Sequence, residues 1–423
     1  MKVLLISTYE LGHQPLGVAA PAAALRERGH DVRALDLAVE DWSVGLAEWA
    51  DRVVMSVPMH TATRLAHEVA DRVDRPLACY GLYAAMCADI GDALVGRDPV
   101  SLVVRWVEDD PTVTVAAPIP ARDLLPPPDQ YTHLMRDGLR YPIAYVEASQ
   151  GCAHRCRHCP VPVVYDGRIR ITDVETVLAD VDAQVRAGAR HITFGDPDFF
   201  NGVHHAQRVI AAVHAAHPDL TFDATVKVEH ILRHEQLWPV MADAGCLFVI
   251  SAFESVNDTI LDHLDKGHTA AEGARAIEIL RSVGIEPRPT WLPFTPWSTV
   301  DDIRGILEFV AAHGLIGNVD PVQFSIRLLV PQGSLLLDRI PDLGPWDAAA
   351  LTYPWTSPLD ELAREFGAVV EAGVDDTAGV VFNRLRALVA LPPVDISTVT
   401  EAPRLSESWF CCAEPTSLQL RSL

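Results

Sequence analysis

The chain has 423 residues, of which 49% are hydrophobic, and it carries a formal net charge of −23. This length predicts two or three domains, each able to bury its own core. The charge would repel nucleic-acid phosphates, and no stretch approaches the roughly 18 apolar residues of a membrane span, so we expect neither a nucleic-acid nor a membrane partner. The eight cysteines do not resemble a disulfide framework, which predicts a reducing, cytoplasmic location.

Residues 1–112 are expected to form a Rossmann-like, doubly wound α/β domain. Short apolar segments at residues 2–8, 31–37 and 52–57 each precede a helical pattern, and the first of these patterns ends on Gly29. Strands that alternate with helices predict a parallel sheet. The first apolar segment is too short for a signal peptide and is interpreted as the first strand.

Three further regions follow. Residues 113–142 are rich in proline and are interpreted as a linker. Residues 143–337 contain six further alternations of strand and helix, and residues 338–423 are expected to be a partly helical C-terminal extension. The six expected strands lie at residues 143–147, 191–195, 221–226, 247–251, 286–291 and 321–326.

Cys152, Cys156 and Cys159 stand on one loop directly after the strand expected at residues 143–147. Three thiolates on a short loop can hold three irons of a cubane cluster and leave the fourth iron open for a ligand. The alternative is a structural zinc site with His154 or His158 as the fourth ligand. Zinc sites are usually built from two short ligand pairs separated by a spacer, so the spacing favours a 4Fe–4S cluster.

The loop resembles the cluster loop of the radical S-adenosylmethionine (SAM) superfamily. A second motif strengthens the resemblance: Glu254-Ser255 is followed by Leu-x4-Lys-Gly-x-Thr, ending at Thr269. The resemblance implies a partial (β/α)6 barrel over residues 143–337, in which the open iron chelates SAM and one electron cleaves it. It places His158 against the adenine and Glu254 and Ser255 beside SAM. It also implies an electron donor such as flavodoxin or ferredoxin.

The same resemblance gives roles to residues at two other strand ends. Gly195 and Asp196 stand where relatives have a turn that approaches the SAM amino group; the alternative is a capping turn. Lys227 and Glu229 alternate along the third expected strand and would share its lumenal face. Lys227 then corresponds to the basic residue that relatives place near the SAM carboxylate, and the alternative is an exposed Lys/Glu pair at a sheet edge.

The sixth expected strand offers a third cofactor-binding candidate. Gln323, Ser325 and Arg327 alternate along it and would share one face. An arginine inside a barrel can clamp a carboxylate through two hydrogen bonds. A structural salt bridge is an equally good interpretation of Arg327.

The layout of residues 1–112 resembles the cobalamin-binding domain that precedes some radical SAM barrels. The usual Asp-x-His-x-x-Gly signature is missing, and the nearest match, residues 10–17, places His13 at a different spacing. We therefore expect His13 to be a loop residue and not a cobalt ligand. Cobalamin remains a possible cofactor, because radical SAM relatives can bind it without that histidine.

Cys411 and Cys412 lie close to the end of the sequence, in the run Cys-Cys-Ala-Glu-Pro. Vicinal cysteines cannot easily form an unstrained disulfide and favour a soft-metal, metalloid or redox role. The run resembles a small radical SAM family with this tail, or with selenocysteine at the position of Cys412, and also the radical SAM proteins that form carbon–arsenic bonds. A solvated, incidental pair is the alternative.

The sequence therefore predicts a radical SAM enzyme, a transferase or an oxidoreductase, that acts on a small and possibly thiophilic molecule. In this interpretation Cys411 and Cys412 present the substrate and are catalytic. Two alternatives stay open: a cobalamin-dependent radical SAM methyltransferase, and a non-enzymatic, thiol-based metal carrier that kept a cluster for structure.

Overall fold

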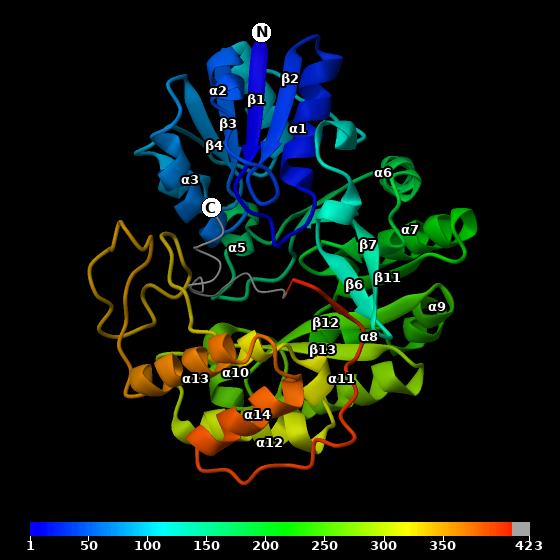
Figure 1. Cartoon of the computed structure of the whole chain (residues 1–423), viewed down its shortest axis with the longest axis vertical. Coiled ribbons are helices and arrows are strands. Elements are labelled where there is room, and N and C mark those ends of the chain that lie inside the picture. Colours follow the sequence, from blue (N-terminus) through cyan, green and yellow to red (C-terminus); the bar gives the residue numbers. More distant parts are fainter. Residues whose placement is uncertain (408–423) are drawn as a thin grey trace.

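The computed structural model describes residues 1–407, so Cys411 and Cys412 lie outside the described residues. Two sheets with helices packed around them dominate this part of the chain, and Figure 1 shows the N-terminal sheet (blue) at one end and helices α12 and α14 at the other. None of the described helices is long and apolar enough to cross a membrane.

The N-terminal sheet has five parallel strands in the order β2-β1-β3-β4-β5. Successive residues of β1 enter different cores: Val3 and Leu5 pack under α1 and α4, whereas Leu4 and Ile6 pack on the face that carries α2 and α3. This order reverses direction between β1 and β3, which creates a crevice at the C-terminal edge of the sheet. The elements are β1 (Lys2–Ser7), α1 (Leu16–Glu27), β2 (Asp31–Asp36), α2 (Val44–Trp49), β3 (Arg52–Ser56), α3 (His60–Ala70), β4 (Leu77–Tyr80), β5 (Asp92–Leu94) and α4 (Pro99–Glu108).

The second sheet has seven strands in the order β13-β12-β11-β10-β7-β6-β14. Strands β7, β10, β11, β12 and β13 run parallel and curl into a half-barrel, and β6 and β14 add antiparallel strands at one edge. The fold class predicted from the sequence is confirmed. The strands are β6 (His133–Arg136), β7 (Leu139–Val146), β10 (His191–Phe194), β11 (Thr221–Thr225), β12 (Cys246–Glu254), β13 (Glu286–Trp291) and β14 (Arg404–Leu405), and a short ribbon is formed by β8 (Ser149–Gly151) and β9 (Ile169–Ile171).

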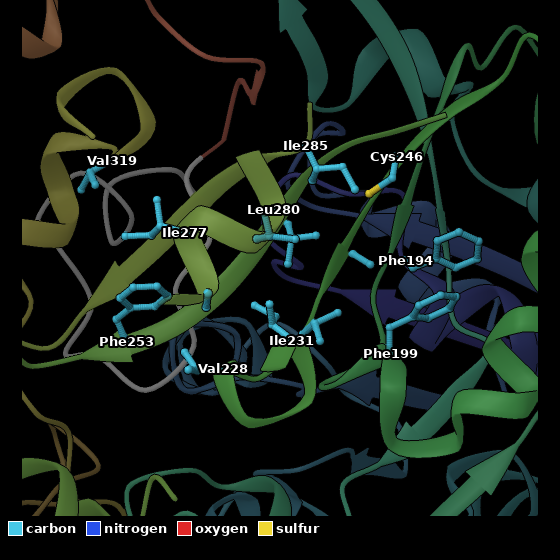
Figure 2. Close-up of a cluster of buried hydrophobic side chains, with 14 of the residues drawn as sticks. Phe194, Phe199, Val228, Ile231, Cys246, Phe253, Ile277, Leu280, Ile285 and Val319 are labelled. Carbon is cyan, nitrogen blue, oxygen red and sulfur yellow. The ribbon is translucent and has the colours of Figure 1, made fainter. Parts of the chain in front are cut away.

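Whereas α5 (Val161–Tyr165) packs against Cys152, most helices of the second half cover the outside of the half-barrel. Their apolar faces and those of the strands form one continuous core, part of which Figure 2 shows between β12 and the helix that carries Ile277 and Leu280. Phe366 and Phe382 belong to the same core, so the C-terminal helices are packed on the barrel. The helices are α5 (Val161–Tyr165), α6 (Val174–Arg186), α7 (Val203–Ala216), α8 (Val228–Arg233), α9 (Trp238–Asp243), α10 (Asp258–Leu264), α11 (Ala270–Ser282), α12 (Val300–Ala312), α13 (Asp360–Ala372) and α14 (Ala378–Leu388).

Two local expectations were wrong. The segment expected as the sixth barrel strand forms a 3-10 helix at Pro321–Ser325, and a single parallel bridge between Phe294 and Arg327 stands in for the strand. The third barrel strand ends at Thr225, so Lys227 and Glu229 do not alternate along it. In addition, residues 113–142 include strand β6.

A buried ion pair joins the expected linker to the barrel. The Arg122 guanidinium donates to both carboxylate oxygens of Asp180 on α6, at 2.9 Å each, and to the backbone oxygen of Tyr145 on β7 at 2.7 Å. It also donates to the backbone oxygen of Gln14, in the loop after β1, at 3.1 Å. Because one buried arginine contacts the N-terminal loop, β7 and α6, it fixes the N-terminal sheet over the carboxyl end of the half-barrel.

Candidate active site at the carboxyl end of the half-barrel

The three cysteines lie on a loop that leaves the carboxyl end of β7, where the active sites of βα barrels are found. Cys152 and Cys156 are buried, Cys159 is partly buried, and none of the three forms a disulfide. Burial raises the pKa of the Cys152 thiol to about 12. A thiolate at this buried position therefore requires nearby positive charge, which metal ions supply.

The spread of the three sulfurs distinguishes a cluster from a single zinc ion. Among the described residues, the one group of three His, Cys, Asp or Glu ligand atoms that lie within 4.8 Å of one another is His154, Asp198 and His230. The three cysteine sulfurs do not form such a group, so at least two of them lie more than 4.8 Å apart, beyond the span of about 4.6 Å that two Zn–S bonds allow. The donor set fits a cluster that holds a separate iron at each sulfur.

The zinc alternative also lacks its fourth ligand. His158 Nε2 lies 3.1 Å from the Glu254 carboxylate, and His154 Nε2 lies 3.4 Å from Asp198. Both histidines are thus directed at carboxylates that come from other strand ends.

The loop after β10 holds the cysteine loop from one side. Asp196 accepts hydrogen bonds from the Ala148 backbone N–H at 2.9 Å and from the Ser149 hydroxyl at 2.6 Å, so both of its oxygens are engaged where the chain enters the cysteine loop. Burial raises the pKa of Asp196 to about 7, against the effect of these hydrogen bonds. Further along, the side-chain oxygen of Asn201 accepts from the Ala153 backbone N–H at 3.1 Å and lies 3.8 Å from the Cys152 sulfur.

Helix α10 holds the opposite side of the cysteine loop. The backbone N–H of Arg157 donates to the carbonyl of Leu264 at 2.9 Å. The Arg157 guanidinium donates to the carbonyls of Asp262 and His263 at 2.8 and 3.0 Å. A cation here satisfies carbonyls at the C-terminal end of the helix.

A buried charged network lies at the centre of the site. Glu254 ends β12 with φ of 64°, a left-handed conformation that is costly for a residue with a side chain, next to a shift in the β12–β13 register. Its Oε1 contacts His158 Nε2 at 3.1 Å and Lys266 Nζ at 3.3 Å. Strained backbone of this kind is found at functional sites.

The Glu254 network keeps its charges despite burial. Burial opposes ionisation of both partners, but Lys266 and His158 lower the pKa of Glu254 to about 2, and Glu254 raises the pKa of Lys266. Lys266 is the lysine of the Leu-x4-Lys-Gly-x-Thr pattern, and the structure shows that it is the charge partner of Glu254.

Lysine is rare in this chain and is concentrated here. The sequence contains three lysines, Lys2, Lys227 and Lys266, and two of them stand at this site. Lys227 is the residue before α8 and lies 3.6 Å from Glu229, beside the turn that carries Gly267 and Lys266. The position of Lys227 at the carboxyl end of β11 was therefore anticipated, although the strand pattern was wrong.

The other sequence-predicted residues lie as follows. Ser255 is buried, and its hydroxyl accepts from the Asn257 backbone N–H at 3.1 Å, at the start of α10. Arg327 faces the C-terminal extension: its guanidinium lies 3.6 Å from the Trp355 ring centroid and 3.0 Å from Asp360. The structural ion pair was one of the two interpretations of Arg327 from the sequence.

A crevice separates the N-terminal sheet from the cysteine loop. It has a volume of about 140 Å³, and its walls include Glu10, Gly17, Ser56, Tyr80, Glu147 and Gln150. The Tyr80 hydroxyl crosses it and donates to the Gly17 backbone oxygen at 2.5 Å. Burial, together with the carboxylates of Glu147 and Asp36, raises the pKa of Glu10 to about 8.

His13 lies between the loop after β1 and the barrel. Its ring stacks on Tyr145 at 4.6 Å between centroids and is 3% exposed. Burial lowers its pKa to about 3. Its ring is thus packed against the first barrel strand.

Comparison with known proteins agrees with this geometry. Residues 146–310 match the family described as the radical SAM superfamily. The chain carries a radical SAM domain. Such a domain implies a 4Fe–4S cluster and SAM, and the matched segment includes all three cysteines and the Glu254 network.

Curated relatives are similar at low identity. A putative methylthiotransferase of Methanocaldococcus jannaschii is 22% identical over 58% of this chain and 53% of its own length. The hopanoid C-3 methylase of Methylococcus capsulatus is 24% identical over 64% of this chain and 59% of its own length. The chain thus spans a little over half the length of these relatives, which support an enzyme.

Two solved structures share the fold. The radical SAM methyltransferase TsrM from Kitasatospora setae, with cobalamin and a 4Fe–4S cluster bound, has a TM-score of 0.57 and 17% identity, over 74% of this chain and 70% of its own. The cobalamin-dependent SAM radical enzyme OxsB has a TM-score of 0.65 and 13% identity, over 90% of this chain and 68% of its own. The 90% coverage by OxsB is large enough that the likeness in fold must extend into the N-terminal sheet.

A substitution at Gly195 tests how tightly the loop after β10 packs against Tyr145 on β7, just before the cysteine loop. A Cβ atom at this position would overlap the Tyr145 ring, so Gly195→Ala should destabilise the fold by about 1–3 kcal/mol and lower cluster retention. Chemical denaturation and iron analysis measure the two effects. Gly367→Ala, on α13 with open space around its Cα, is the matched control and should stabilise the fold by up to about 1 kcal/mol, since alanine is favoured over glycine in a helix. In a Tyr145→Ser background, Gly195→Ala should cost less than in the wild type; equal costs with and without the Tyr145 ring would contradict this packing.

Proposed function

We propose that this protein is a radical SAM enzyme in which Cys152, Cys156 and Cys159 hold a 4Fe–4S cluster and Glu254 contacts SAM. The observation that carries the proposal is the combination of three cysteines that form no disulfide and do not converge on one zinc position with the buried His158–Glu254–Lys266 network at the same strand ends. The cluster, when bound, supplies the electron that cleaves SAM.

The chain's own residues would divide the remaining work. Lys227 and Lys266 place positive charge beside the cysteine loop, which favours thiolates and the SAM carboxylate. Gly195 and Asp196 act through the cysteine loop: the glycine admits the Tyr145 ring, and the aspartate fixes Ala148 and Ser149. In this proposal Ser255 helps to fix the start of α10 beside Glu254, and Arg327 anchors the C-terminal extension to the barrel.

We further propose that Cys411 and Cys412 present a small thiophilic substrate, such as trivalent arsenic or selenium, to the radical. Two adjacent sulfur donors suit a soft atom. The last described residue, Glu407, accepts a hydrogen bond from Tyr9 at 2.5 Å and lines a cavity of about 750 Å³.

The cluster assignment predicts a specific loss of iron. Anaerobic reconstitution of the wild-type chain should give about four irons and four sulfides. The Cys152→Ala, Cys156→Ala, Cys159→Ala triple variant should lose the acid-labile sulfide and the charge-transfer absorption. The matched control is Cys246→Ala, which removes a buried thiol at the first residue of β12, the end of the strand away from the site, and should leave the cluster unchanged. Wild-type sulfide content in the triple variant would rule out these ligands.

The tail assignment predicts a separation of two activities. Cys411→Ser with Cys412→Ser should leave iron content and SAM cleavage without acceptor near wild type, since the loop already provides three ligands. In the same variant, product formation with the true acceptor should be abolished. Arsenite and selenite are the first compounds to be tested as acceptors. Loss of the cluster, or full turnover without these thiols, would show that the tail has another role.

A cobalamin-dependent radical SAM methyltransferase is the second candidate, favoured by the likeness in fold to TsrM and, over 90% of this chain, to OxsB. A corrinoid would bind in the crevice between the N-terminal sheet and the cysteine loop, at the edge where the strand order of that sheet reverses. The volume of this crevice, about 140 Å³, is below the roughly 300–1,000 Å³ of common ligand pockets, so binding would require the loop after β1 and Tyr80 to move. Corrinoid that copurifies with the protein would favour this candidate.

A further inference from the structure

A second group of potential metal ligands lies beside the cysteine loop. His154 comes from that loop, Asp198 follows β10, and His230 lies on α8 after β11. His154 Nε2 and His230 Nδ1 lie 3.4 and 2.8 Å from the same Asp198 oxygen, Oδ2. The three atoms are all within 4.8 Å of one another, a spacing that one metal ion can bridge.

These three atoms are buried and have no hydrogen-bond partner. His154 Nε2, Asp198 Oδ2 and His230 Nδ1 are all inaccessible, and the short distances between them do not meet hydrogen-bond geometry. Asp198 is 0% exposed. Buried polar atoms are nearly always paired, and an unpaired carboxylate oxygen is particularly costly. Three such atoms that face one another form an arrangement that one bound cation would satisfy.

The surroundings hold the three side chains in place. The second oxygen of Asp198 accepts from the Phe200 backbone N–H at 3.2 Å, which leaves Oδ2 directed at the histidines. The other ring nitrogen of His154 lies 3.7 Å from Glu229 Oε2. A carboxylate on the far side of an imidazole is the usual way in which a metal-binding histidine is oriented.

We propose that His154, Asp198 and His230 bind one divalent first-row transition ion, zinc(II) or iron(II), that is separate from the cluster. Two imidazoles and one carboxylate suit these ions and leave further coordination positions for water. The ion links the cysteine loop to the carboxyl ends of β10 and β11. The competing interpretation is a metal-free set of ion pairs that fastens the same three segments.

The decisive measurement compares the total metal content of the protein with its acid-labile sulfide content. Tag-free wild-type protein, reconstituted and then equilibrated with zinc(II), should contain one metal ion more than its acid-labile sulfide. Asp198→Asn and His230→Gln should lose this additional ion while sulfide stays constant. His217→Gln is the matched control. His217 also pairs with a carboxylate, that of Asp182 at 2.6 Å, but this pair is not part of a three-ligand group among the described residues.

Cobalt(II) provides a spectroscopic measurement that does not depend on the cluster. The triple cysteine-to-alanine variant should bind one equivalent of cobalt(II) with visible ligand-field bands, and Asp198→Asn in that background should weaken binding by about 100-fold or more. Circular dichroism establishes that each variant is folded. If wild-type metal equals sulfide after zinc loading, or if Asp198→Asn leaves the additional ion bound, the proposal is overturned.

Discussion

The site depends on how the cysteine loop is held, because a loop with no regular hydrogen bonding must be ordered by its neighbours. The segment after β10 fixes one side through Asp196 and Asn201, and Arg157 fixes the other side to the C-terminal carbonyls of α10. Both sets of contacts come from segments later in the sequence, one after β10 and one after β12, so the conformation of the loop depends on these strands being in place. The geometry of the three thiols is thus a property of the whole sheet.

The candidate site concentrates positive side chains although the chain as a whole is strongly negative. The net charge is −23, yet two of the three lysines stand at the cysteine loop. A buried lysine costs free energy unless a carboxylate pairs with it, and Glu254 supplies this partner for Lys266. The pair leaves positive charge near the thiols and a strained carboxylate at the end of β12, the combination expected of a site that binds an anionic cluster and a zwitterionic ligand.

Much of the fold could be predicted from the sequence because long parallel strands bury both faces and give clear apolar runs. Strands β5 and β6 were missed because they have only three and four residues, too few to show a clear apolar pattern. At Lys227 the alternation with valines suggested a continued strand, but α8 begins at Val228. The alternation of Gln323, Ser325 and Arg327 likewise suggested a strand, but a 3-10 helix begins there at Pro321. Alternation over four residues does not separate a strand from the start of a helix.

The candidate site was predictable at the cysteines and at Glu254, where spacing and motif coincide, and less so elsewhere. Asp196 illustrates the reason: its position at a strand end was evident, but its partners, Ala148 and Ser149, are fixed by packing between two loops. The roles of Asp198, Asn201 and His230 likewise depend on contacts between separate strand ends. The Asp-Pro-Asp run after β10 was the one sequence signal for this group.

The most direct test of the account is the fate of SAM when it is incubated with the reduced, cluster-loaded protein. We expect SAM to be consumed, with release of 5'-deoxyadenosine or methylthioadenosine, and we expect Glu254→Gln to suppress this reaction while it keeps the cluster. The identity of the nucleoside shows which S–C bond breaks. If the cluster-loaded, reduced protein leaves SAM intact, the central claim that this site performs radical SAM chemistry is wrong.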